Sequence, residues 1–324
     1  MHISLLVFSI SLISTTLSNP VHYDQINNKL TAISEQIDQA ELRLNNSITK
    51  LLSKLDSSNH DLTQLIKSLH TSRVVDNIQS SNQAVSALLI IDVQYDFIDG
   101  SLALKNCPSK HNGEEVIPVI NQLLDSHKFD VVAYSHDWHP TNHISFFDNL
   151  HLRSHLLTPD SIPLADLKLY STATFAINGL PRMEQSLWPR HCVQNTHGAK
   201  LHSDLKVIEE DNAQNISVIH IQKGTKPDVD SYSAFWDNSK LSETQLNQFL
   251  KEKGVTQVFV VGLATDWCVY STAIHGMEHG YKTFIIEDAC RGVDEKTIKE
   301  RLNDFTQKNG HIIKSSQVKD YIQE

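Results

Sequence analysis

Around residue 264 the sequence passes from an apolar run through a glycine to a cysteine: Val260-Val261-Gly262-Leu263-Ala264-Thr265-Asp266-Trp267-Cys268. Residues 258–261 predict a buried strand that ends at Gly262. Thr265 is then a candidate N-cap, which places Cys268 in the first turn of a helix, where N–H groups lack partners and the helix dipole is positive. We expect a thiol there to have a depressed pKa and to act as a nucleophile. The alternative is a buried, inert cysteine.

The same alternation of strand and helix runs from residue 86 to the C-terminus. Residues 87–91 are continuously apolar, as expected for a buried parallel strand. Further strands are predicted at residues 131–134, 216–221, 256–261, 283–286 and 312–313, and helices at 114–126, 241–253, 266–279 and 295–308. This order predicts an α/β fold, a doubly wound parallel sheet with helices on both faces, which binds its ligands at the carboxyl ends of the strands. Residues 141–186 are predicted to be an irregular insertion over that edge.

Length and composition restrict the possible classes of protein. The 324 residues suffice for a large core plus an appended segment. A content of 40% hydrophobic and 20% charged residues is typical of a globular protein. The formal net charge of -10 argues against a role in binding nucleic acid or a membrane surface.

The N-terminus resembles a secretion signal. Residues 1–13 are mostly apolar but too few to span a bilayer comfortably, and small or polar residues follow them. We predict a signal peptide over residues 1–18, cleaved near Ser18, so that the mature protein is extracellular and free of the membrane. The alternative is an uncleaved anchor.

Secretion changes how the cysteines and asparagines are interpreted. Asn45 and Asn215 each begin an acceptor sequence for N-glycans, a short pattern that is often unused. The chain has four cysteines, too few for a disulfide-based scaffold of this length. At most we expect one disulfide, between Cys107 and Cys290.

Residues 19–72 are predicted to form a helical segment that resembles a coiled coil. They are poor in glycine and proline, and aliphatic residues recur at steps of four and three with one stutter. We expect this segment to join subunits into a homo-oligomer, either as a coiled coil or as a helical hairpin. The alternative is a single amphipathic helix lying on the catalytic domain. The polar residues 73–85 are predicted to be a linker.

Charged side chains follow two of the predicted strands. Asp92 ends the first strand, where a carboxylate is costly unless it is used or paired. Lys223 follows the strand at residues 216–221, where it could favour a thiolate and pair with Asp92. Taken alone, Asp92 could be a turn cap and Lys223 an ordinary surface lysine. Together with Cys268 they put an acid, a cation and a thiol at one edge of the sheet.

A second group of residues has the composition of a metal site. Asp137 and His139 follow another strand and, being two residues apart, point to the same side of an extended chain. His143 lies in the same loop, and His191 lies further along the chain next to an aromatic residue. One aspartate and two histidines form a known ligand set for zinc, iron or manganese. Because the chain has 18 histidines, each of these could also be a packed or surface residue.

Taken together, the motifs resemble those of the nicotinamidases in the isochorismatase-like hydrolase superfamily. The resemblance extends from about residue 87 nearly to the C-terminus, with several separated motifs in the right order, and it predicts a hydrolase domain over residues 86–324. The motifs are Ile91-Asp92-Val93-Gln94-Tyr95-Asp96-Phe97, Asp137-Trp138-His139-Pro140, Trp188-Pro189-Arg190-His191-Cys192-Val193, Lys223-Gly224 and Gly262-Leu263-Ala264-Thr265-Asp266-Trp267-Cys268-Val269.

The resemblance implies an activity and a role for each of these positions. The activity would be hydrolysis of the small molecule nicotinamide to nicotinate and ammonia. Asp92, Lys223 and Cys268 resemble the catalytic triad of the family; Asp137, His139 and His191 resemble its ligands for a divalent metal such as zinc, with His143 as a possible further ligand; Phe97, Trp188 and Tyr232 resemble the walls of its pyridine pocket. The bond between Leu263 and Ala264 resembles the cis peptide of the family, beside which the N–H groups of Ala264 and Cys268 would bind an oxyanion.

Two other functions remain open from the sequence. One is a related metal-free amidohydrolase acting on a ureido or carbamoyl substrate, which would share the aspartate, lysine and cysteine but would not need the three metal ligands. The other is a secreted, non-catalytic binding protein. All the motif residues of the triad and the ligand set are present, which favours the metal-dependent enzyme.

Overall fold

A computed structural model describes residues 84–322 of the chain. The predicted signal peptide, the predicted coiled coil, most of the linker and the sequon at Asn45 lie outside the described residues. Asn215, the other predicted glycan acceptor, is exposed in a turn. Within the described residues no helix has the length and apolar character needed to cross a membrane.

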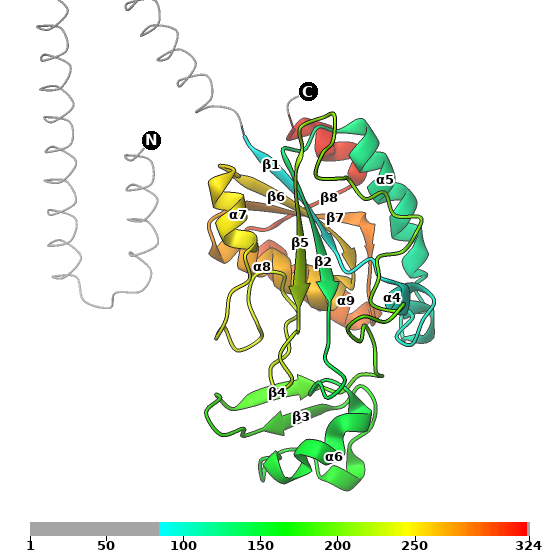
Figure 1. Ribbon diagram of the computed structural model, residues 1–324, viewed down its shortest axis with the longest axis vertical. Coiled ribbons are helices and arrows are strands. Elements are labelled where there is room, and N and C mark those ends of the chain that lie inside the picture. Colours follow the sequence, from blue (N-terminus) through cyan, green and yellow to red (C-terminus); the bar gives the residue numbers. More distant parts are fainter. Residues whose placement is uncertain (1–83, 323–324) are drawn as a thin grey trace, which may run out of the picture. The chain divides into compact units, whose positions relative to one another are not determined.

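The centre of the fold is a six-stranded sheet in the order β5-β2-β1-β6-β7-β8, in which every pair of neighbours is parallel (Figure 1). The strands are β1 (Ser86–Ile91), β2 (Val131–Asp137), β5 (Ser217–Lys223), β6 (Gln257–Leu263), β7 (Lys282–Arg291) and β8 (His311–Ile313). The strand order reverses between β1 and β6, which opens a crevice at their carboxyl ends. The predicted parallel sheet is therefore confirmed.

Alternating side chains of β1 contribute to two separate cores, one on each face of the sheet. Leu88 and Ile90 pack in the core that includes the apolar side of α5, whereas Ala87 and Leu89 pack with α7, α8 and α9. All six residues of β1 are buried, as expected for a strand covered on both faces. The helices are α4 (Tyr95–Ile98), α5 (Val116–Ser126), α6 (Leu150–Arg153), α7 (Leu246–Glu252), α8 (Tyr270–Glu278) and α9 (Glu295–Gln307). Short 3-10 turns cover Leu104–Asn106, Gly113–Glu115, Phe147–Asn149, Ser154–Leu156, Leu164–Asp166 and Ser315–Asp320.

Two predicted helix starts are wrong, for local reasons. The helix expected at residues 241–253 begins only at Leu246, because Asp237 accepts the N–H groups of Leu241 and Ser242 and holds them in a loop. Thr265 is not an N-cap: the capping position is Ala264. Thr265–Val269 forms a π-helical turn before α8, in which the N–H of Val269 donates to the carbonyl of Ala264 at 3.1 Å.

The insertion at residues 141–186 is more regular than its sequence predicts. It contains α6 and an antiparallel hairpin of β3 (Thr172–Phe175) and β4 (Met183–Ser186), and it lies beyond the carboxyl ends of β2 and β5 (Figure 1). A small apolar core of its own holds it together and includes Ile144, Phe175 and Leu187. The strands are only four residues each, too short for alternation to show clearly in the sequence.

The predicted disulfide between Cys107 and Cys290 is wrong, since all four cysteines are free and buried. Cys107 packs in the core on the α5 side of the sheet, and Cys290 packs in the core on the opposite side. The sheet therefore separates the Cys107 thiol from the Cys290 thiol, which the sequence alone does not show.

Gly262 allows β6 to run close beside β1. Its φ is 112°, and a Cβ there would lie 2.1 Å from the carbonyl oxygen of Ile91. Gly280 also has a positive φ, of 90°, but a Cβ there would meet no atom within 4 Å.

We predict that Gly280→Ala lowers the free energy of unfolding by about 1–3 kcal/mol through backbone strain alone. Gly262→Ala should cost at least about 2 kcal/mol more, because the clash adds to that strain. Urea unfolding of the two variants measures the difference, and equal losses would contradict the packing argument.

Candidate active site

Four side chains that can take part in acid–base or nucleophilic chemistry lie at or just after the ends of four strands, at one edge of the sheet. Asp92 directly follows β1, Asp137 ends β2, Lys223 ends β5, and Cys268 lies in the π-helical turn after β6. Because the strands are parallel and adjacent in the order β5-β2-β1-β6, their carboxyl ends bring these side chains together. Asp92 has a φ of 48°, a left-handed conformation at the point where the chain turns out of the sheet.

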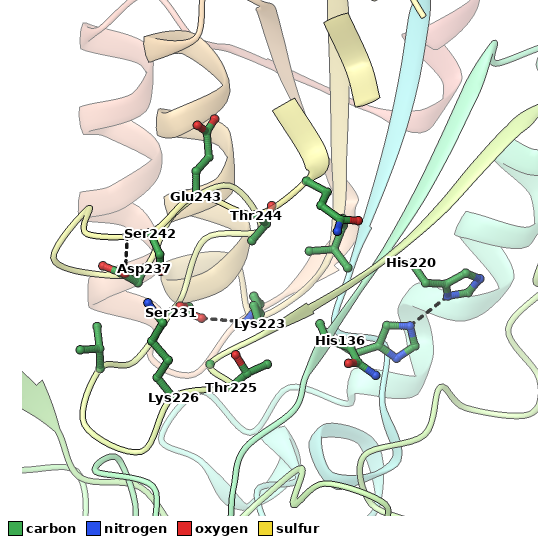
Figure 2. Close-up of a pocket in the computed structure, with 15 residues that line it drawn as sticks. His136, His220, Lys223, Thr225, Lys226, Ser231, Asp237, Ser242, Glu243 and Thr244 are labelled. Carbon is green, nitrogen blue, oxygen red and sulfur yellow. Dashed lines mark hydrogen bonds between the residues drawn. The ribbon is translucent and has the colours of Figure 1, made fainter. Parts of the chain in front are cut away.

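The Lys223 ammonium is the centre of this cluster. Its Nζ lies 2.8 Å from Asp92 Oδ2 and 2.5 Å from Asp137 Oδ1. It also donates to the Ser231 carbonyl at 3.1 Å (Figure 2). Cys268 Sγ lies 3.4 Å from the same nitrogen. The lysine side chain has no exposed surface. The structure thus brings Asp92, Lys223 and Cys268 into one buried network, with Asp137 as a fourth member.

Burial dominates the proton affinities in this network. It raises the pKa of the Cys268 thiol well above its usual range, although the Lys223 ammonium acts against it. It likewise raises the pKa of Asp92, again against the ammonium. Burial alone would lower the pKa of Lys223, but Asp137 and Asp92 together raise it well above its usual range. The predicted depressed thiol pKa is therefore wrong, because desolvation and two carboxylates outweigh one ammonium and a helix end.

A second cluster shares Asp137 with the first. Its Oδ2 atom lies 3.5 Å from His139 Nε2 and 3.6 Å from His191 Nε2. The Nδ1 atom of His139 lies 2.9 Å from the Gly224 carbonyl, and that of His191 lies 2.7 Å from the Pro189 carbonyl. A carbonyl only accepts hydrogen bonds, so each Nδ1 carries the proton and each Nε2 turns a lone pair to the cluster. One carboxylate oxygen and two imidazole nitrogens within 4.8 Å of one another have the composition of a metal site.

His143 and Asp230 extend this cluster. The His143 ring stacks on His139 with 4.0 Å between centroids, and its Nδ1 bonds the Ser145 hydroxyl at 2.7 Å. Its Nε2 is buried without a hydrogen-bond partner and lies 3.8 Å from Asp230 Oδ1. Such an orphaned nitrogen is the feature expected of an additional ligand. Sequence reasoning missed Asp230, although it stands only two residues before Tyr232.

Two side chains from the first motif, the buried Gln94 and the half-buried Asp96, hold these clusters in place. Gln94 accepts the N–H of Asp137 at 2.9 Å and donates to its carbonyl at 2.8 Å. Asp96 accepts the N–H of Cys192 at 2.7 Å, which fixes the segment that carries His191. Gly198 permits this approach, since a Cβ there would lie 2.1 Å from the Asp96 carboxylate. The sequence showed these residues as part of the motif but gave them no role.

One pocket joins the thiol to the metal-type cluster. Phe97, Trp188, Tyr232 and Ala264 line it together with Cys268, Asp137, His139 and His191. Trp267 completes the aromatic wall, with its ring centroid 4.8 Å from that of Trp188 and 5.1 Å from that of Tyr232. Sequence reasoning missed Trp267 and the apolar residues Leu102, Leu104 and Val293 as pocket residues. The peptide bond between Leu263 and Ala264 is cis.

Comparison with known proteins gives a consistent family relationship. The family model for the isochorismatase domain matches residues 86–317. A nicotinamidase of Escherichia coli is 36% identical over 211 residues, which cover 64% of this chain and 84% of that protein. The solved structure of the yeast nicotinamidase matches 70% of this chain and 99% of its own, at 30% identity and a TM-score of 0.58. A pyrazinamidase of Pyrococcus horikoshii, solved in complex with zinc, matches 71% and 99% at 27% identity and a TM-score of 0.50.

The raised pKa of Cys268 predicts how its reactivity depends on pH. Only the thiolate is alkylated, so the rate for Cys268 in the chelator-treated native protein should keep rising from about pH 8 to about pH 10. In the urea-unfolded chain the rate should reach half of its maximum at the ordinary cysteine pKa of 9.0 and approach its plateau by about pH 10, at a lower pH than in the native protein. Mass spectrometry of the iodoacetamide-labelled Cys268 peptide measures both rates. A plateau in the native protein at a lower pH than in the unfolded chain would contradict the analysis.

Proposed function

The chain belongs to the isochorismatase family, and from that premise we propose that it hydrolyses nicotinamide to nicotinate and ammonia. Its relatives include nicotinamidases, and the similarity extends over most of the length of those proteins. The observation that carries the proposal is the Lys223 ammonium, which lies 2.8 Å from Asp92 and 3.4 Å from Cys268 beside three metal-type ligands. An acid, a thiol and a ligand cluster that face one aromatic pocket suit attack on an amide attached to a pyridine ring.

The first chemical step is formation of a thioester on Cys268. Asp92 takes the thiol proton, and Sγ attacks the carboxamide carbon of the substrate. Lys223 offsets the negative charge that moves between the carboxylate and the sulfur. The N–H groups of Ala264 and Cys268 hold the oxyanion of the tetrahedral intermediate. When this intermediate collapses, the C–N bond breaks and Asp92 returns its proton to the departing ammonia.

The second step is hydrolysis of the thioester. Asp92, ionised again, takes a proton from a water molecule that attacks the thioester carbon. The C–S bond then breaks, nicotinate leaves, and the proton held by Asp92 returns to the Cys268 sulfur. One water molecule is consumed and one ammonia molecule released in each cycle, so the enzyme ends the cycle unchanged.

Asp137, His139 and His191 would hold a divalent metal, with His143 as a possible further ligand. The residues fit such an ion, because the Nε2 atoms of His139 and His191 face the cluster with a free lone pair that a metal can accept. The buried His143 Nε2 has no hydrogen-bond partner. When bound, the ion supplies a Lewis acid that anchors the pyridine nitrogen. Zinc is the leading choice, because the related pyrazinamidase is solved with zinc; iron and manganese accept the same ligand set.

The pocket walls orient the ring for this chemistry. Phe97 packs against His191 with 5.5 Å between ring centroids, so this aromatic wall is continuous with the ligand cluster. Trp188 and Tyr232, joined through Trp267, form another part of the wall. A flat pyridine held among these rings would present its carboxamide to Cys268. Orientation of this kind is the contribution we assign to Phe97, Trp188 and Tyr232.

The two rival functions are less well supported. A metal-free amidohydrolase would not need the three-ligand cluster, yet this cluster is buried and its histidine tautomers are fixed. A non-catalytic binding protein would have no reason to bury an ammonium between two carboxylates next to a thiol, an arrangement that is costly to build.

We also propose that the mature protein is secreted, glycosylated and assembled through its N-terminal segment. The support is the sequence of residues 1–72 and, for glycosylation, the exposed position of Asn215. Sequencing of the N-terminus after expression in eukaryotic cells tests the cleavage near Ser18. Light scattering of the chain with and without residues 19–72 tests the assembly.

We predict that Cys268→Ala lowers kcat on nicotinamide by more than about 10³-fold, because no other group can form the thioester. The matched control is Cys290→Ala, which removes another buried, free thiol and should retain hydrolysis. Ammonia release from purified protein measures both. Near-native release by Cys268→Ala would refute the mechanism, and the same assay with ureido and carbamoyl substrates tests the metal-free rival.

We predict that a chelator removes activity and that zinc restores it. His191→Ala should lose one equivalent of bound metal because one of three ligands is gone, whereas replacement of the exposed His151 by alanine should not. The number of metal ions per chain is measured by inductively coupled plasma mass spectrometry, and circular dichroism checks that each variant is folded. Activity that survives chelation, in a protein without metal, would favour the metal-free amidohydrolase.

A further inference from the structure

Outside the active site, two histidines lie together at the edge of the sheet. His136 of β2 and His220 of β5 are neighbours across the two strands, with 3.0 Å between His136 Nε2 and His220 Nδ1 (Figure 2). His136 is half-buried and His220 is exposed, and both line an open pocket beside β5. The mechanism proposed above uses neither residue.

A buried tyrosine fixes the position of this pair. The His220 ring stacks on Tyr134 with 5.0 Å between centroids and 15° between planes. Tyr134 is itself anchored, because its hydroxyl donates to the Lys206 carbonyl at 3.1 Å and accepts the N–H of Ile208 at 3.0 Å. His220 is therefore held in place by the core even though its edge faces solvent.

We infer that His136 and His220 form a second transition-metal site, of the kind that binds Zn²⁺. Two imidazole nitrogens bound to one tetrahedral zinc ion, each at about 2.0–2.1 Å, lie roughly 3.3–3.4 Å apart, so the 3.0 Å separation in the pair has to widen only slightly. The nitrogens now share a hydrogen bond, and a rotation of the His136 ring about its broad Cβ–Cγ torsion, with His220 kept on Tyr134, turns both lone pairs to one ion. Imidazole is a preferred ligand of zinc, nickel and copper.

Acidic residues next to the pair add to its capacity for a cation. Burial lowers the pKa of His220, and the carboxylates of Glu210 and Glu209 act in the opposite direction, so both lie near its ring. Both glutamates are exposed, and neither brings a carboxylate oxygen within 4.8 Å of both rings, so water would complete the shell around the two imidazoles. With only two histidines fixed in place, this site binds its ion more weakly than the cluster around Asp137.

This site is distinct from the cluster proposed for catalysis. Successive side chains of a strand point to opposite faces, so His136 points away from Asp137, its neighbour on β2. His136 shares the face of Tyr134, which packs in the core on the α5 side. A metal ion on the pair therefore does not touch Lys223 or Cys268.

The test is calorimetric titration of the chelator-treated full chain with Zn²⁺. Wild type should bind one more equivalent than His220→Gln or His136→Gln. Replacement of the exposed His155 by glutamine is the matched control and should leave the stoichiometry of wild type. His220→Gln should keep nicotinamide hydrolysis, which also shows that it folds.

Two outcomes separate this inference from the proposed catalytic metal. In the His191→Ala background the equivalent bound by the pair should persist, and adding His220→Gln should remove it. If His220→Gln and His136→Gln both bind as much Zn²⁺ as wild type, the pair is an ordinary hydrogen bond between neutral imidazoles and the inference is overturned. A loss confined to His191→Ala would support the catalytic site alone and would likewise overturn it.

Discussion

The Lys223 ammonium carries its charge with no exposed surface, and the geometry of the site follows from how that charge is neutralised. An isolated ammonium in such a place would lose several kcal/mol of hydration or give up its proton. Asp92 and Asp137 prevent both, at 2.8 and 2.5 Å. Since these residues end three neighbouring strands, the network also joins β1, β2 and β5 at the edge where the reaction is proposed to occur. Removing either carboxylate would leave the buried ammonium with one carboxylate partner instead of two.

Asp137 makes the two functional clusters interdependent. One of its oxygens faces Lys223 and the other faces His139 and His191. Gln94 fixes its backbone from both sides, so neither oxygen can improve its contact at the expense of the other. The distance from thiol to ligand cluster is thereby set by one residue at the end of β2. This fixed distance favours a substrate that can contact the Cys268 thiol and the ligand cluster at the same time.

Much of this arrangement could be predicted from the sequence because parallel sheets obey simple rules. Apolar runs located the strands, and the rule that strand ends share an edge placed Asp92, Lys223 and Cys268 together before any coordinates were known. The rules fail where a contact joins distant segments. The sequence does not show that the sheet separates Cys107 from Cys290, that Asp237 holds back the start of α7, or that Asp230 returns to His143. The prediction of a depressed pKa for the Cys268 thiol was wrong for the same reason, because this pKa depends on desolvation by neighbours that a local motif does not contain.

The pocket is built from two layers with different constraints. The strand ends supply the carboxylates, the ammonium and the thiol, and their positions are fixed by the sheet. The insertion and the segment after it supply walls and ligands, including Trp188 and His191. This layer is attached through Arg153, which is buried and donates to Asp228 and to the carbonyls of Asn142 and Pro227. Gln185 of β4 makes a further connection by donating to Asp230 at 3.0 Å. The second layer has a small apolar core, which Val229 from the loop after β5 shares. No residue of the insertion at 141–186 lines the pocket, whose walls come from α4, the segment after the insertion, the loop after β5 and the π-helical turn after β6. The contacts that select a substrate are therefore divided among these segments, while the acid, the ammonium and the thiol stay at the ends of the strands.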